Sequence, residues 1–198
     1  MSTTTKPLSK ESQKEIDDQK DKANKEKQIE RIIEQFKRLD IDLQNAILAE
    51  ATTMKETTTI VEFNGIVGDL LKFIINISKQ NQKYSGYDFS GFETLFRTGT
   101  KADAKIAISN FTMVSLPVAD KILFRDDGFF LNTFDPSQID SAIEKKGSGL
   151  NIFTSDKFKE LWKKLDSPYK NHIFEKAGIL VYKGFVYFAQ ISGLKCPI

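Results

Sequence analysis

Residues 60–77, IVEFNGIVGDLLKFIINI, are the most apolar run of this 198-residue chain, and the fold depends on them. Apolar residues recur along the run at spacings of three and four, which places them on one face of a helix. They are Ile60, Phe63, Val67, Leu70, Ile74 and Ile77. Further apolar residues widen that face until little polar surface remains. Such a helix has to be buried under its own domain or against another chain.

The same run has about the length of a membrane span. It contains Glu62, Asp69 and Lys72, and a charge near the centre of a bilayer costs ~2.5–3.5 kcal/mol. We therefore expect a buried helix and no membrane span. The first fifteen residues, MSTTTKPLSKESQKE, contain no apolar signal segment. We accordingly expect a protein that stays in the cytoplasm or is assembled into a particle.

A second helix is predicted over residues 28–56, where apolar residues fit the a and d positions of a heptad. They are Ile29, Ile32, Phe36, Leu39 and Leu43. Two interpretations stay open, an amphipathic helix on the chain's own core and an intermolecular coiled coil. The β-branched residues 57–59 favour a break between the two helices. We expect a helical hairpin over residues 28–83 rather than one long helix.

Composition divides the rest of the chain into an arm and a head. Residues 1–27 alternate lysine with acid and predict a disordered or solvated charged arm. Residues 79–91 read as a linker, which puts the start of a head domain at residue 84. In the head, residues 121–132 and 178–193 read as β-hairpins turning at Asp127-Gly128 and Lys183-Gly184. Short helices, one over residues 155–165, complete an α+β fold.

The chain has few residues for catalysis or metal binding. His172 is the only histidine and Cys196 the only cysteine, so Cys/His zinc sites and catalytic triads lack their parts. A carboxylate enzyme would have to use a pair such as Glu160 with Asp166. We predict no enzyme, no cofactor and no metal. Net charge is +2, and the lysines of residues 157–176 alternate with acids, so nucleic-acid binding is not favoured.

A pattern in the last 45 or so residues resembles a known family. Its residues are Gly149, Leu150, Asn151, Trp162, Ser167, Pro168, Gly178, Gly184, Tyr187, Gln190 and Gly193. They resemble the C-terminal half of CAP (SCP/PR-1-like) domains, an α-β-α sandwich. Leu150 stands at the family's glutamate position and Lys170 at a histidine position. The resemblance implies a degenerate copy that binds a ligand or peptide, in a pocket of Phe153, Trp162, Tyr182 and Tyr187.

The sequence thus favours a non-enzymatic structural protein that contacts protein partners, as a homo-oligomer or within a larger assembly such as a virion. Two helices alone cannot bury the apolar stripes of residues 28–77, so a partner or the head has to cover them. The stripe residues from Ile29 to Ile77 named above are the predicted partner-binding face. The CAP-like binding module is the alternative.

Overall fold

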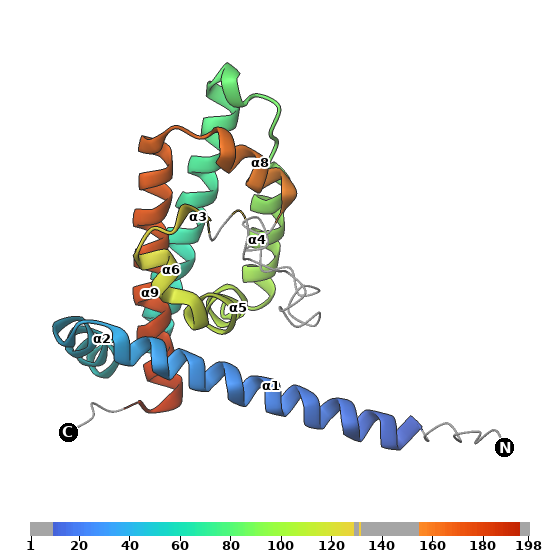
Figure 1. Ribbon diagram of the computed structural model, residues 1–198, viewed down its shortest axis with the longest axis vertical. Coiled ribbons are helices and arrows are strands. Elements are labelled where there is room, and N and C mark those ends of the chain that lie inside the picture. The colour runs from blue at the N-terminus through green and yellow to red at the C-terminus, as the bar shows by residue number, and fades with distance from the viewer. Residues whose placement is uncertain (1–9, 129–130, 132–154, 195–198) are drawn as a thin grey trace.

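The computed structural model describes residues 10–128, 131 and 155–194 (Figure 1). Within those ranges every regular element is a helix and no strand occurs. The α-helices are α1 (Lys10–Arg38), α2 (Ile41–Thr53), α3 (Glu56–Gln80), α4 (Ser90–Ala102), α5 (Ile106–Ser115), α6 (Ala119–Leu123), α8 (Asp156–Lys164) and α9 (Ser167–Ser192). The 3-10 turns are η1 (Gln82–Tyr84) and η2 (Leu116–Val118). The expected α+β class is therefore wrong, and the described chain is all-α.

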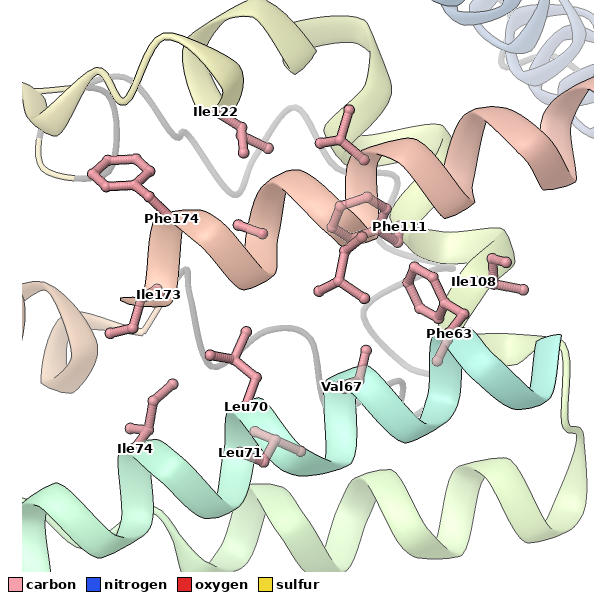
Figure 2. Close-up of a cluster of buried hydrophobic side chains, with 14 of the residues drawn as sticks. Phe63, Val67, Leu70, Leu71, Ile74, Ile108, Phe111, Ile122, Ile173 and Phe174 are labelled. Carbon is pink, nitrogen blue, oxygen red and sulfur yellow. The ribbon is translucent and has the colours of Figure 1, made fainter. Parts of the chain in front are cut away.

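Helices α3 and α9 form the centre of the molecule. They lie side by side and run in opposite directions (Figure 1). Helix α3 contains the run of residues 60–77, and its apolar face is buried, as predicted. Figure 2 shows Phe63, Val67 and Ile74 of α3 facing side chains of α5, α6 and α9. The cover that the sequence required therefore comes from the chain itself.

Helix α9 occupies the residues that were predicted to form the second β-hairpin, so that prediction is wrong. Its Val, Ile, Tyr and Phe content resembles a strand pair, but a short apolar run is ambiguous between strand and helix. Buried residues recur at helical spacing, among them Ile173, Ala177, Leu180 and Phe188. Pro168 lies in the first turn, and Gly193 ends the helix at φ 65°, which glycine adopts without strain.

The other predicted hairpin, at residues 121–132, is also wrong where the structure describes it. Residues up to Leu123 belong to α6, which closes with Arg125 at a positive φ of 56°. Asp127 and Gly128 are helical and form no hairpin turn, and the Asp127 carboxylate accepts hydrogen bonds from Trp162 and Lys170. The second half of the predicted hairpin, like the helix start expected at Asp135, lies outside the described residues.

The N-terminal helices have different boundaries from those expected. Helix α1 ends at Arg38, and Asp40 then caps α2 by accepting a hydrogen bond from the Asp42 backbone N–H at 2.8 Å. Helix α3 begins at Glu56, so residues 57–59 form its first turn and the chain turns at Met54-Lys55. Both α2 and α3 pack against α9. Helices on either side of residue 84 share one hydrophobic cluster.

Gly184 allows α9 to approach α5 and η2 closely. A Cβ atom at this position would lie 3.2 Å from Leu116 Cδ2 and 3.4 Å from Phe111 Cδ1. Glycine costs a helix interior about 1 kcal/mol relative to alanine, and the close packing at this crossing offsets that cost. The Lys183-Gly184 pair, which suggested a turn, therefore marks a helix crossing.

The predicted helix over residues 155–165 is confirmed as α8. Ser155 caps it, since its Oγ accepts a hydrogen bond from the Phe158 backbone N–H at 3.2 Å. Phe158, Leu161 and Trp162 are buried on its inner face. This prediction succeeded because helical spacing and a capping residue agreed.

Candidate functional site

Most of the predicted partner-binding face lies inside the molecule. Ile32, Phe36, Ile60, Phe63, Val67, Leu70, Ile74 and Ile77 are buried. Leu39 and Leu43 are half-buried against the same core. Of this set only Ile29, at 40% exposure, is open to solvent. Phe36, for example, packs against Phe185 of α9 with ring centroids 5.8 Å apart. In this fold the buried residues of the stripe stabilise the chain itself.

The outer part of α1 is one surface that remains accessible. From residue 18 to residue 31 its side chains are exposed, with Gln28 half-exposed, and burial begins at Ile32. Figure 1 shows α1 running out beyond the other helices toward the N-terminus. We call residues 10–31 the projecting arm. At 1.5 Å per residue the arm is about 33 Å long.

Over residues 18–31, where its side chains are described, the arm is a helix with no apolar face. Within residues 18–31 the only large apolar residue is Ile29. A helix that is polar all round has to rely on charge pairs along its own surface or on a partner. Asp18–Lys22 and Asp21–Lys25 have the acid-before-base spacing of four that contributes ~0.2–0.5 kcal/mol a pair. Such pairs give a marginal helix, so the arm stands to gain stability from a partner.

A charge cluster joins α2, α3 and α9 on the body. Lys183 Nζ lies 2.6 Å from Glu50 Oε1 and also donates a hydrogen bond to Glu62 Oε2. The Tyr182 hydroxyl donates to the other Glu50 oxygen at 2.7 Å. The Lys183 side chain is 14% exposed, Glu50 21% and Glu62 40%. Lys183 and Glu50 are covered well enough that their charges need pairing, so the cluster fixes the position of α9 on α2 and α3.

The cluster changes the ionisation of its members. Burial alone would raise the pKa of Glu50, but hydrogen bonds from Lys183 and Tyr182 outweigh it and hold that pKa below its ordinary value. Burial opposes the charge on Lys183, yet the two glutamates outweigh it and raise the lysine pKa. Burial and the bond to Glu50 raise the pKa of Tyr182 to about 12. Lys183 and Glu50 are therefore charged at neutral pH, and the Tyr182 hydroxyl keeps its proton there.

No sequence pattern pointed to this cluster. Glu50 and Glu62 lie 133 and 121 residues before Lys183. Lys183 itself was assigned to a hairpin turn. Nothing in the sequence distinguishes Glu50 and Glu62 from the other acidic residues of the chain. Only the helical register of α9, which turns Lys183 toward α2 and α3, brings the three side chains together.

The residues of the predicted ligand pocket make separate contacts. Trp162 is buried and donates its indole N–H to Asp127 at 2.7 Å, with Lys170 above its ring. Tyr182 contacts Glu50, whereas the Tyr187 hydroxyl lies 3.1 Å from Ser109 Oγ on α5. Phe153 lies outside the described residues. The structure does not bring the described three to a common site, and the CAP-like resemblance stays a prediction.

The residues considered for catalysis have structural partners. The His172 ring packs on Phe73 with centroids 4.2 Å apart. The Asp166 carboxylate accepts hydrogen bonds from Lys83 at 2.6 Å and Tyr84 at 2.9 Å. The hydrogen bond from Lys83 is the main cause that lowers the pKa of Asp166. Across the described part of the chain no group of three His, Cys, Asp or Glu side chains is arranged to hold a metal.

The lysines of residues 157–176 are partly engaged on the body. Lys157 donates to the Asp88 carbonyl at 3.0 Å, and Lys164 lies over the Tyr87 ring. Lys170 pairs with Asp127 at 2.9 Å. These contacts hold α8 and α9 against neighbouring segments. Three of the six lysines in residues 157–176 therefore have a structural role.

One segment, Ile106–Leu123, is long and apolar enough to cross a membrane by length and composition. It comprises α5, η2 and α6, with Pro117 in the 3-10 turn. Core helices of soluble proteins pass the same test, and Ile108, Phe111, Leu116 and Ile122 of this segment are core residues here. The segment is therefore weak evidence for a span.

Comparison with known proteins gives one informative match. No protein-family model matches the chain, and no solved structure matches it. The chain is 30% identical over 157 residues to the uncharacterized protein R465 of Acanthamoeba polyphaga mimivirus. The match covers 79% of this chain and 84% of the viral protein. At that identity and coverage, this chain belongs to the same protein family as the mimivirus protein.

Proposed function

We propose that the protein is a non-enzymatic assembly protein and that the projecting arm, residues 10–31, makes its protein–protein contacts. The observation that carries this proposal is the contrast between the two parts of α1. Ile32 and Phe36 are buried in the body, whereas the side chains of residues 18–27 are all exposed. A helix that continues several turns past the body it packs on has surface for a partner.

The composition of the arm says what kind of partner suits it. Over residues 18–31, where Ile29 is the one large exposed apolar residue, the arm cannot supply the apolar centre of a large permanent interface. Its contacts are charged, which favours specificity and orientation over strength. A partner presenting a matching charged helix fits this chemistry. A place in a virion stays a prediction, supported only by the viral origin of the relative.

Site-specific photo-crosslinking in cells that express the native gene tests the proposal. A photoreactive residue replaces Lys20 on the arm and, as a matched control, Lys101 on the exposed surface of α4. We expect the Lys20 position to yield discrete protein adducts, identified by mass spectrometry, that the Lys101 position does not yield. Equal labelling from both positions, or no adduct from the arm, would refute the proposal.

A further inference from the structure

The face of α1 that packs on the body continues outward along the arm. Phe36 and Ile32 hold the body side of this face and are buried. Stepping outward by alternating spacings of three and four gives Ile29, then Lys25 and Lys22, then Asp18 and Glu15. In this line the apolar residues of the body give way to two bases and then to two acids. We call Glu15, Asp18, Lys22 and Lys25 the arm seam.

From this order of charges we infer that the arm's partner is a second copy of this chain, with the two arms paired antiparallel along the arm seam. Antiparallel pairing places Glu15 of each copy opposite Lys25 of the other, and Asp18 opposite Lys22. All four contacts then join opposite charges. Parallel pairing would place each seam residue opposite itself and make all four contacts repulsive. This inference rests on the proposed function, for which it names the partner.

The charge along the whole arm agrees with the seam. Residues 10–21 carry three basic and five acidic side chains, a net charge of −2. Residues 22–31 carry four basic and two acidic side chains, a net charge of +2. Two antiparallel arms bring the negative half of each against the positive half of the other. Complementarity of this kind sets the orientation of a complex.

The length of the arm also suits this pairing. With Asp18 opposite Lys22, Lys10 of one copy lies opposite Glu30 of the other. Burial on the body begins at Ile32, so the paired helices overlap over the full arm and stop short of both bodies. The two bodies then lie at opposite ends of a helical connection about 33 Å long.

Because its contacts are exposed and ionic, the pairing is weak and sensitive to salt. The Debye length falls from about 10 Å at 0.1 M salt to about 3 Å at 1 M. Sedimentation equilibrium of the full chain is the measurement. We expect concentration-dependent dimers at about 0.1 M salt and a dissociation constant at least about tenfold larger at about 1 M. A chain that stays monomeric at the lower salt concentration would overturn the inference.

Two charge-reversal variants make the test specific. Lys22→Glu with Lys25→Glu makes the arm seam wholly acidic, and Glu15→Lys with Asp18→Lys makes it wholly basic. We expect each variant alone to lose self-association at low salt and their equimolar mixture to regain it as a heterodimer. The matched control, Lys101→Glu with Lys163→Glu on the body, should dimerise like the unmodified chain. A mixture that fails to associate, or an acidic variant that still dimerises, would overturn the inference.

The orientation of the two arms is measured by zero-length carbodiimide cross-linking. Unlabelled copies of the unmodified chain are mixed with copies labelled with nitrogen-15, so that a link between two copies contains both isotopes. Antiparallel arms predict mixed-isotope links from Lys25 to Glu15 and from Lys22 to Asp18. Mixed-isotope links from the arm only to the body of the other copy would overturn the inference. The proposed function is tested separately and is refuted if the Lys20 position yields no protein adducts in cells. A chain that is monomeric but whose arm crosslinks to a different protein overturns only the pairing between two copies.

Discussion

Replacing Lys183 by methionine should destabilise the protein by about 2 kcal/mol. Methionine keeps the apolar stem of the lysine but removes its hydrogen bonds to Glu50 and Glu62. Breaking a fully buried ion pair costs ~3–5 kcal/mol, and an exposed one contributes ~0.2–1 kcal/mol. The cluster lies between these limits, because Glu50 is 21% exposed while Glu62, at 40%, regains water.

The assays are urea unfolding and thermal unfolding, both followed by circular dichroism. For a chain of this size 1 kcal/mol corresponds to ~2–4 °C in Tm, so the expected loss is about 4–8 °C. Lys72→Met is the matched control, because Lys72 is 55% exposed and 3.5 Å from Asp69. It should change the free energy of unfolding by less than about 0.5 kcal/mol.

A compensated variant separates the loss of the charge pair from the loss of packing. Changing Glu50 and Glu62 to glutamine together with Lys183→Met removes the unpaired charges, so most of the lost stability should return. If the triple variant is no more stable than Lys183→Met, or if Lys183→Met costs no more than Lys72→Met, the cluster does not hold α9 in place.

The same cluster predicts a dependence on acid pH. The pKa of Glu50 is lower in the folded protein than its ordinary value of 4.5. Its contribution is therefore complete above pH 4.5 and is lost as the pH falls through the folded pKa. The difference in unfolding free energy between the unmodified chain and Lys183→Met should shrink over that acid range.

Three further predictions concern the body. Gly184→Val should lower the free energy of unfolding by about 1–3 kcal/mol, because the added side chain overlaps Leu116. Gly65→Ala should raise it by up to about 1 kcal/mol, because a Cβ at residue 65 meets no atom within 4 Å. Equal effects in urea unfolding would contradict the close approach of α9 to η2 at Gly184. The Tyr182 pKa of about 12 lies above the ordinary 10.0. The contribution of Tyr182 to the stability of the fold is therefore complete below pH 10 and is lost as the pH rises through 12. Ultraviolet titration of the unmodified chain and of Tyr182→Phe should show no phenolate from Tyr182 at pH 10. Asp127→Leu should cost ~1–3 kcal/mol in unfolding free energy, because it removes the carboxylate that accepts the hydrogen bond of the buried Trp162 indole N–H. A cost below that of the exposed substitution Lys72→Met would contradict this prediction.

The sequence predicted α3 well because one signal dominated there. Ile60, Phe63, Val67 and Ile74 repeat at helical spacing over about four turns, and each is buried. Helix α8 was predicted for the same reason, with Ser155 as a cap. Long periodic runs with agreeing caps leave little choice of secondary structure.

Helix α9 was missed because its composition and its register conflict. Val181, Tyr187 and Phe188 favour strands, and Lys183-Gly184 resembles a turn. Burial against α2, α3 and α5 decides in favour of the helix, and such tertiary contacts cannot be read from local propensity. The error had a second consequence. Without α9 the stripe of α3 lacked a cover, so the sequence argument assigned partner contact to residues that are core.

The arm was the part of the candidate site that sequence could identify. The charge alternation of residues 1–27 predicted a disordered or solvated arm, and residues 18–27 are exposed in a helix. What sequence alone did not show was where the body ends. Once Ile32 and Phe36 are known to be buried, the outward continuation of their face defines the arm seam.

Hydrogen exchange of the full chain tests the central claim most directly, which is that the body is self-sufficient while the arm is stabilised by a partner. Amides of α3 and α9 should be protected at every protein and salt concentration. Amides of residues 18–27 should exchange rapidly in dilute protein or high salt and slow down in concentrated protein at low salt. Protection of α3 that depends on protein concentration, or arm exchange that never slows, would contradict the account.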